Sequence, residues 1–449
     1  MRSHYIGLMS GTSLDGVDGV LVAFAESAPR PTTYVVRHPA CRPDGLRQPQ
    51  SPFRAFVRGL SPPGGGETLG AARRLFLMSA PRPAKADRPP RESRKVAEPH
   101  FLESDEAPMR IRAHAHREFA PALKHELLAL NTPGQNELHR SALAGNALAR
   151  TCAGVVGDLL QQAQVGAEAV VAIGAHGQTV RHRPREFDAT GYTLQLNNPA
   201  LLAELTGIDV VSDFRSRDVA AGGQGAPLAP AFHRAVFGRA GECIAVLNIG
   251  GISNLSVLGG DGSTLGFDCG PGNALMDHWC LTHTGAAFDR GGAWAASGTV
   301  DSRLLAALQT EPYFDLAPPK STGRDLFNPA WLALQLQAHA CSPQDVQATL
   351  TQLTAWACAQ SVLRFASGAK RLIVCGGGAL NAQLMRSLTA HLTPLPVQTS
   401  DVWGVPIDQV EAAAFAWLAK AFVHREAGNL IAVTGACGPR VLGALYPAR

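Results

Sequence analysis

A run of glycine, hydroxyl and carboxylate residues lies near the start of the chain, between the apolar segments 5–9 and 20–24. The run contains Gly11, Thr12, Ser13, Asp15, Gly16 and Asp18. Glycines let a backbone approach a bulky anion, and consecutive N–H groups can bind phosphate oxygens. A carboxylate there could hold a divalent cation through waters. We therefore predict a strand, a turn and a strand that bind a nucleoside triphosphate, although an ordinary hairpin turn also favours Asp-Gly.

A second turn of the same kind follows the apolar segment 244–249. It contains Gly250, Gly251 and Asn254, and it lies about 240 residues after the first turn. Two such turns suggest two pseudo-equivalent domains that bind one triphosphate from both sides. Asp268 follows the second hairpin in a glycine-rich segment with few cations nearby, and such a carboxylate is a candidate general base.

Three further clusters follow apolar segments. His176 and Gln178 come directly after residues 170–174 and are candidates for a ligand site, although a histidine there is as often structural. Asp213 and Arg215 precede a glycine-rich loop, where the guanidinium could bind a carboxylate; a surface salt-bridged turn is the alternative. The third cluster consists of Gly376, Gly377 and Gly378. It leaves room for a flat base or a ribose; the alternative is a plain helix-capping turn.

The order of apolar segments predicts an α/β protein. Segments 170–174, 208–211, 244–249 and 371–375 have the length and composition of buried strands, whereas 349–366 and 412–423 have helical apolar faces. A helical pattern also begins near residue 117 and continues to residue 160. Polar groups after parallel strands lie where open α/β sheets bind ligands.

The length, net charge and composition of the chain limit the classes of protein to which it can belong. The 449 residues predict two sizeable domains, and a formal net charge of +4 does not favour nucleic-acid or membrane binding. The N-terminus does not resemble a signal peptide, and the nine scattered cysteines fit free thiols in a reducing compartment. We therefore expect a cytoplasmic protein. One segment, 49–108, is rich in proline and mixed charge, and we expect it to be a disordered surface insertion.

Taken together, these motifs resemble the anhydro-N-acetylmuramic acid kinase family of the sugar kinase/Hsp70/actin superfamily. The matching segments, in one-letter code, are 7–18 (GLMSGTSLDGVD), 174–180 (GAHGQTV), 193–195 (TLQ), 213–218 (DFRSRD), 222–227 (GGQGAP), 248–254 (NIGGISN), 268–273 (DCGPGN), 320–324 (KSTGR), 375–378 (CGGG) and 434–436 (TGA). The resemblance covers nearly the whole chain except the segment near 49–108. Cys269 stands where the family usually has threonine.

The resemblance implies an α/β fold of two ribonuclease-H-like domains with a cleft between them, here 1–242 and 243–449. It implies a reaction that uses ATP, Mg²⁺ and water to open 1,6-anhydro-N-acetylmuramic acid and phosphorylate O6, in the recycling of cell-wall peptidoglycan. A homodimer is compatible with it. The alternatives are a plain sugar kinase that acts on a free hydroxyl and a non-catalytic nucleotide switch of the actin/Hsp70 kind.

The resemblance also implies residue roles. Asp268 would be the base, with Asp213 as the second candidate, and Asp15 would lie near Mg²⁺. The sugar would contact His176, Gln178, Asp213, Arg215 and Glu411, with Arg215 on the lactyl carboxylate. ATP would contact Gly11, Thr12, Ser13, Leu14, Asp15, Gly16, Val17, Asp18, Gly250, Gly251, Asn254, Gly376, Gly377 and Gly378.

Overall fold

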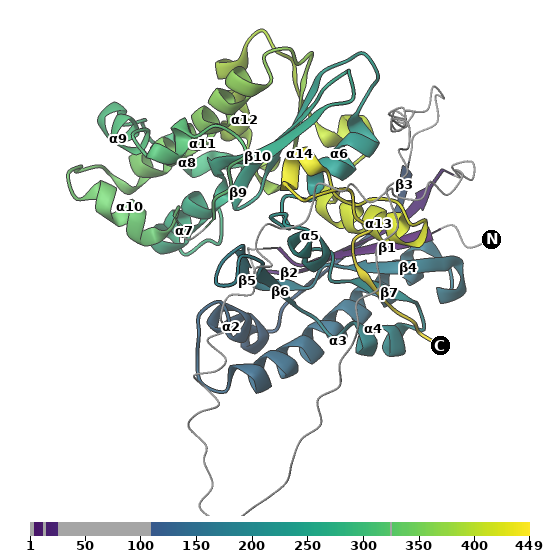
Figure 1. The fold of residues 1–449 in the computed structure, drawn as a ribbon. Helices are drawn as coiled ribbons and strands as arrows, with labels where there is room; N and C mark the ends of the chain where they lie inside the picture. Colours follow the sequence, from purple (N-terminus) through teal and green to yellow (C-terminus); the bar gives the residue numbers. More distant parts are fainter. Residues whose placement is uncertain (1–3, 12–14, 26–108, 324–325) are drawn as a thin grey trace, which may run out of the picture. The chain divides into compact units, whose positions relative to one another are not determined.

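The computed structural model describes residues 4–11, 15–25, 109–323 and 326–449 (Figure 1). The chain divides into two compact units, 1–38 with 101–449 and 39–100, and every described residue belongs to the first. The predicted insertion at 49–108 and three residues of the first turn lie outside the described residues; the three are Thr12, Ser13 and Leu14.

The first sheet has six strands in the order β13-β7-β4-β1-β2-β3. β1 pairs antiparallel with β2, which pairs antiparallel with β3, whereas β4 and β7 continue the other side in parallel. β13 pairs antiparallel with β7. The bounds are β1 His4–Met9, β2 Gly16–Phe24, β3 Met109–Glu118, β4 Val170–Ala175, β7 Val210–Ser212 and β13 Ala444–Tyr446.

The second sheet has five strands in the order β10-β9-β8-β11-β12. β8, β9 and β10 form an antiparallel meander, and β11 and β12 continue from β8 in parallel. This is the order of the first sheet without β13, and it confirms the predicted α/β class with two ribonuclease-H-like sheets. The bounds are β8 Ile244–Ile249, β9 Ile252–Leu258, β10 Thr264–Pro271, β11 Leu372–Cys375 and β12 Val397–Thr399.

The remaining elements are helices and one small hairpin. The hairpin consists of β5 (Gln178–Pro184) and β6 (Gly191–Leu196). The helices are α2 Pro121–Ala129, α3 Glu137–Ala163, α4 Pro199–Thr206, α5 Ser216–Ala220, α6 Ala229–Phe237, α7 Asn273–Thr284, α8 Ala293–Ser297, α9 Ser302–Leu308, α10 Pro329–Leu336, α11 Pro343–Phe365, α12 Ala382–Leu392, α13 Val410–Val423 and α14 Ile431–Thr434. Short 3₁₀ turns include η4 (Pro312–Asp315), η5 (Gly377–Leu380) and η6 (Ser400–Trp403).

The predicted strands and helices agree with the structure where the apolar pattern was clear. Segment 244–249 is β8, 170–174 lies within β4, and 412–423 lies within α13. The prediction for the residues around 117 was wrong, because 109–118 form β3 and α2 begins only at Pro121. β3 alternates charged or imidazole side chains with apolar ones up to His116, since only one of its faces is buried.

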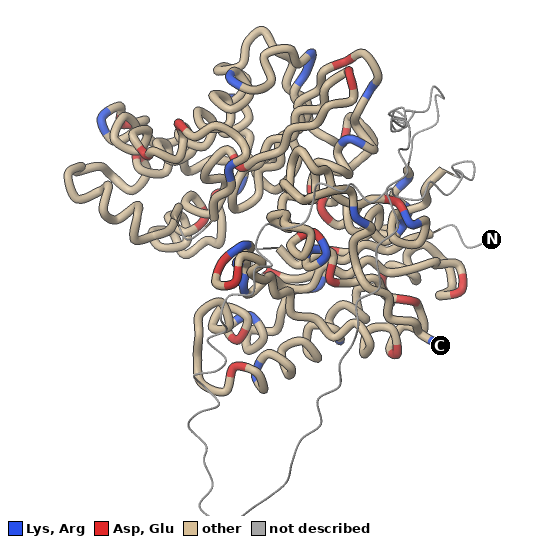
Figure 2. The backbone as a smooth tube through the Cα atoms, viewed as in Figure 1, with Lys and Arg blue, Asp and Glu red and all other residues tan. Residues whose placement is uncertain are grey.

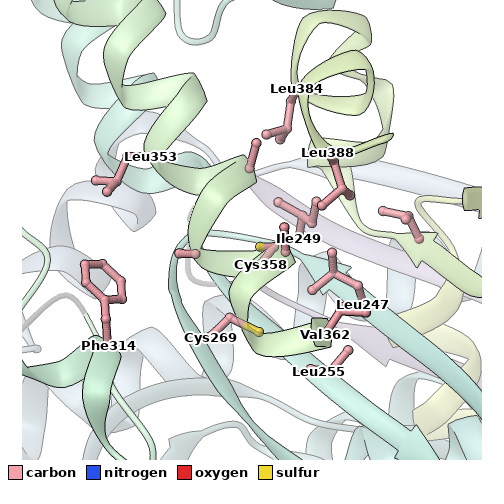
Figure 3. Packing of buried hydrophobic residues seen from close by; sticks show 14 of the residues in the cluster. Leu247, Ile249, Leu255, Cys269, Phe314, Leu353, Cys358, Val362, Leu384 and Leu388 are labelled. Carbon is pink, nitrogen blue, oxygen red and sulfur yellow. The ribbon is translucent and has the colours of Figure 1, made fainter. Parts of the chain in front are cut away.

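The core of the second sheet lies between its strands and α11 and α12 (Figure 3). Leu247 and Ile249 of β8 pack with Leu353 of α11 and Leu388 of α12. α11 begins where the Ser342 side chain accepts a hydrogen bond from the backbone of Asp345, with proline at the first helical position. This core fixes the strand ends from which the second predicted phosphate turn and its neighbours project.

α13 packs directly against β1 and β4 of the first sheet, although it is formed by residues more than 230 positions later in the chain (Figure 1). A methyl group on Gly7 would overlap the Ala412 carbonyl, and one on Gly174 would overlap the Phe415 carbonyl. The two glycines therefore allow the helix backbone to lie on the strands. The predicted domain boundary at residue 242 stays a prediction, and residues 410–449 make these contacts with the first sheet.

We expect Gly174→Ala to destabilise the protein by about 3 kcal/mol, because the added methyl must displace the α13 backbone. The measurement is the free energy of unfolding from urea titration. Gly157→Ala is the matched control, since Gly157 lies inside α3 with no atom near the position of an added Cβ. That control should gain about 0.5–1 kcal/mol. Equal stability of the two variants would contradict the close approach of α13.

Candidate functional site

The first predicted phosphate turn connects β1 to β2. Asp15 is exposed, and its backbone carbonyl accepts a hydrogen bond from the Phe119 N–H at 3.0 Å. A Cβ on Gly16 would meet the carbonyl of Arg117 and lie 2.8 Å from the imidazole of His116. Val17 is buried in the core, so its side chain is not available to a ligand. The end of β3 therefore packs against the described part of this turn.

Asp18 of β2 binds two histidines of β3. His116 Nδ1 donates to Asp18 Oδ1 at 2.8 Å, and His114 Nε2 lies 3.5 Å from the same oxygen. Burial acts to raise the pKa of Asp18, but the hydrogen bonds to His114 and His116 outweigh it and lower the pKa. The carboxylate is therefore ionised near neutral pH.

The second predicted phosphate turn is hydrogen-bonded to the segment that follows β10. The Gly250 carbonyl accepts from the Asn273 N–H at 2.8 Å, and the Gly251 carbonyl accepts from the Gly272 N–H at 3.0 Å. These bonds place the start of α7 beside the turn. Asn254, four residues into the same segment, has a buried side-chain oxygen without a hydrogen-bond partner among the described residues.

The strand register aligns Asp268 with this second turn. Asn248 of β8 pairs with Asn254 of β9, and Asn254 pairs with Asp268 of β10. Directly paired residues of an antiparallel sheet project from the same face, so these three polar side chains form one row across the sheet. Asn248 Nδ2 then donates to Glu411 Oε1 of α13 at 3.0 Å. The row therefore extends from Asp268 to Glu411.

The surroundings of Asp268 bring the pKa of its carboxyl group close to neutral pH. Burial raises the pKa of Asp268 to about 6, opposed by a hydrogen bond from the Thr322 N–H at 3.0 Å and by the charge of Lys320. The backbone of Asp268 is held at both ends: its N–H donates to the Lys320 carbonyl, and its carbonyl accepts from the Tyr313 hydroxyl at 2.8 Å. A positioned carboxylate with a pKa near 6 is suited to general-base catalysis at neutral pH.

The glycines after β11 lie against β8. The Gly376 N–H donates to the Ile407 carbonyl at 3.0 Å, and Gly376 has a φ of 81° that disfavours other residues. A Cβ on Gly378 would overlap the Ile249 side chain, so only a glycine fits there. Gly377 is exposed, and the Asn381 side chain caps α12 just beyond it. The turn is therefore both close-packed on one side and open on the other.

His176 and Arg215 contact one another at the carboxyl ends of β4 and β7. Arg215 Nε donates to His176 Nε2 at 3.0 Å, and its Nη1 donates to the Gly225 carbonyl at 2.8 Å. Burial, and then the charge of Arg215, lower the pKa of His176 well below its usual range. The imidazole is therefore neutral, and its proton lies on Nδ1, a buried atom without a partner among the described residues.

Two other residues predicted to bind the sugar lie at the same edge. Gln178 is buried at the start of β5 and accepts a hydrogen bond from the Ser10 hydroxyl at the end of β1. Asp213 is exposed just after β7, with a φ of 58° in the left-handed region, and its Oδ1 is 3.4 Å from the Ser216 N–H. No hydrogen bond joins Asp213 to Asp268 among the described residues.

Asp218 holds the glycine-rich loop 222–227 in place. Its carboxylate is completely buried and accepts hydrogen bonds from Gly225 N at 2.7 Å, Asn429 Nδ2 at 2.6 Å and Thr434 Oγ1 at 2.8 Å. Because Arg215 binds the carbonyl of Gly225, the same carboxylate fixes one partner of that guanidinium. Arg215 also interacts with two carboxylates through its charge. Burial lowers the pKa of Arg215 to about 10, and the charges of Glu411 and Asp218 oppose this decrease.

Sequence reasoning missed several residues of this site. Lys320 and Thr322 belong to a motif that we identified, but no pattern indicated that Thr322 would bind the Asp268 carboxylate or that Lys320 would accept from the Asp268 N–H. Asn248 also lay within a motif without receiving a role. The signal for His114 and His116 was their spacing of two residues, which places both on one face of a strand.

The two sheets of matching strand order, each with a glycine turn between its first two strands, indicate an α/β protein of the sugar kinase and actin type. The chain belongs to the anhydro-N-acetylmuramic acid kinase family, whose model matches residues 3–52 and 99–448. It is therefore a kinase that uses ATP and acts on a small sugar, and not a non-catalytic nucleotide switch.

Close relatives support this assignment. The anhydro-N-acetylmuramic acid kinase of Albidiferax ferrireducens is 59% identical and covers 100% of both chains. That of Variovorax paradoxus is 66% identical over 75% of this chain and 92% of its own length. Among solved structures, a ROK hexokinase from Thermus thermophilus is 16% identical over 69% of this chain and 92% of its own, with a TM-score of 0.27, and the assignment does not rest on it. Within the described residues, no helix has the length and apolar character to cross a membrane.

We expect Arg215→Lys to raise KM for the sugar about tenfold while KM for ATP stays within twofold. The guanidinium binds His176 and Gly225 from separate nitrogens, and a single ammonium group cannot reproduce that geometry. Steady-state kinetics with each substrate varied in turn will test this. Arg217→Lys, at an exposed position two residues further on, is the control. Equal increases in both KM values would assign Arg215 a structural role.

Proposed function

We propose that Asp268 is the general base of a hydrolytic phosphorylation of 1,6-anhydro-N-acetylmuramic acid. Asp268 takes a proton from water as the water oxygen bonds to C1 of the sugar. The C1–O6 bond breaks, O6 bonds to the γ-phosphorus of ATP, and ADP leaves. The products are N-acetylmuramic acid 6-phosphate and ADP. Such a step belongs to the recycling of cell-wall peptidoglycan.

The observation that carries this proposal is the placement of Asp268. Its pKa is raised to about 6 by burial, and it lies in the same polar row as Asn254 of the second glycine turn. Asp213, the second candidate, is exposed on the other sheet beside Arg215. A base must lie within hydrogen-bond reach of the proton that it abstracts. Because O6 leaves C1 for the γ-phosphorus, the attacked carbon is near the phosphates, and Asp268 pairs with Asn254 of the second turn.

The two glycine turns would hold the phosphates of ATP, and the third glycine cluster would hold its adenosine. Backbone N–H groups at both turns can donate to phosphate oxygens, which is the main requirement of phosphoryl transfer. The first turn contributes Gly11 to Asp18, and the second contributes Gly250, Gly251 and Asn254. The exposed side of the turn at Gly377 can accommodate a flat base.

A magnesium ion would bind beside the first turn. Kinases usually hold Mg²⁺ through one or two carboxylates together with the phosphates of the nucleotide. The exposed position of Asp15 suits such a role, and the described residues contain no cluster of three or more ligands that could hold a metal without a nucleotide. When bound, the ion would offset phosphate charge. Asp268, Arg215 and Glu411 would orient water and sugar.

The sugar would bind at the carboxyl ends of β1, β4 and β7. The Nδ1–H of the neutral His176 has no partner among the described residues and can donate to a sugar oxygen. Arg215 keeps its positive charge and can face the lactyl carboxylate, and Gln178, Asp213 and Glu411 supply further polar groups. Since ATP is a cytoplasmic substrate, we place the reaction in the cytoplasm. A homodimer stays a prediction.

We expect kcat/KM to fall tenfold for each pH unit below about 6, because protonated Asp268 cannot accept the proton from water. Asp268→Asn should lower kcat by roughly 10²–10⁴ and remove this dependence. The amide oxygen can still accept from Thr322, so ATP binding and the unfolding midpoint should change little. If Asp213→Asn is inactive and Asp268→Asn retains wild-type kcat, the base is Asp213.

We expect turnover of 1,6-anhydro-N-acetylmuramic acid. With N-acetylmuramic acid we expect kcat/KM to be at most about 1% of that value, because general-base catalysis contributes at least about two orders of magnitude. The open sugar has a free O6 hydroxyl, and its anomeric hydroxyl occupies the position of the attacking water. Coupled measurement of ADP release with each sugar tests this. Equal kcat/KM values would identify a plain sugar kinase.

A further inference from the structure

Two histidines of β3 lie over the first glycine turn. In the register of β2 and β3, His116 is directly opposite Asp18, and His114 is opposite Val20, two residues along the same strand. Both imidazoles approach the same carboxylate oxygen, at 2.8 Å from His116 Nδ1 and 3.5 Å from His114 Nε2. The side chains of Asp18 and His116 are both about one-third exposed, so this contact lies at the surface of the turn.

A second contact places His116 against the turn independently of Asp18. A Cβ on Gly16 would lie 2.8 Å from Cε1 and Nε2 of His116, so the imidazole covers the bare face of that glycine. The Phe119 N–H also donates to the Asp15 carbonyl at 3.0 Å, three residues beyond His116. The end of β3 therefore contacts Asp15, Gly16 and Asp18 on the described side of the turn.

The charge of Asp18 makes these contacts relevant to a nucleotide. The carboxylate is ionised near neutral pH, and its charge also acts on Glu411, whose pKa burial raises first and Asp18 raises further. A triphosphate at the turn would meet this negative charge. The hydrogen bond from His116 and the nearby imidazole of His114 hold the Asp18 oxygen beside β3 and offset its charge. Asp408 is the other acidic group that acts on His114.

We propose that His114 and His116 are positioning residues for ATP: they hold the Asp18 carboxylate and the Gly16 backbone so that the first turn can bind the triphosphate. This inference rests on the proposed function, in which residues 11–18 bind the phosphates. The two histidines act through Asp18 and Gly16 and do not contact the reacting atoms.

The test replaces each imidazole in two ways. Asparagine places an amide nitrogen where His116 has Nδ1, and glutamine places one where His114 has Nε2, whereas leucine removes the donor at either position. We expect His116→Leu to raise KM for ATP, and Kd for a non-hydrolysable ATP analogue measured by calorimetry, about tenfold. His114→Leu, at the longer distance, should raise them about threefold. Rescue means that His116→Asn and His114→Gln stay within twofold of wild type.

KM for the sugar and kcat should stay within twofold in every histidine variant, since the described groups that interact with His114 and His116 are Asp18, Gly16 and Asp408, and none of these is proposed to bind the sugar. Arg112→Leu, an exposed position on the same strand, is the matched control and should leave all three quantities unchanged. Equal increases in the KM values of ATP and sugar, or an asparagine variant as weak as the leucine variant, would overturn the inference.

A double-mutant cycle separates this inference from the proposed function. If His116 acts through Asp18, His116→Leu should weaken binding of the analogue much less in an Asp18→Asn background than in wild type. Fully additive effects would contradict the coupling. If Asp18→Asn by itself leaves binding of the analogue unchanged, the nucleotide role of the turn is wrong. If Asp18→Asn weakens binding and the histidine variants do not, only the positioning role is wrong.

Discussion

The hydrogen bond between Asn248 Nδ2 and Glu411 Oε1 joins the two sheets at the centre of the site. Glu411 lies in the first turn of α13, a helix that packs on the first sheet, whereas Asn248 is the next-to-last residue of β8, the central strand of the second sheet. Its carboxylate also acts on the charges of Arg215 and Asp18. One side chain therefore connects the groups proposed to bind the sugar, the first turn and the row that ends at Asp268.

This connection depends on how closely α13 approaches β1 and β4. The helix backbone can lie on the strands only because Gly7 and Gly174 have no side chains. If the helix were displaced outward, Glu411 would move away from Asn248 and Arg215 would lose a compensating charge. The glycines of the strands are thus as important to the site as the glycines of the turns.

The sequence was sufficient for much of the fold and for the segments that form the site. Apolar runs such as 244–249 and the glycine turns after them are local signals, and they correctly indicated β8 and the turn at Gly250. The environment of Asp268 could not be predicted, because Thr322 and Tyr313 reach it from distant loops. β3 was missed because its exposed face carries arginine and histidine, which weakens the apolar pattern on which such predictions rest.

The return of residues 410–446 to the first sheet has a consequence for the order of folding. On the ribosome, β1, β2 and β4 emerge long before α13, which covers them, and before β13, which pairs with β7. The buried carboxylate of Asp218 likewise lacks two of its hydrogen-bond donors until Asn429 and Thr434 have been made. The first sheet therefore stays incomplete until residues 410–446 have been made, with apolar surface exposed to solvent or chaperones. Contacts between elements more than 200 residues apart, such as α13 with β1, also slow folding, because they close long loops.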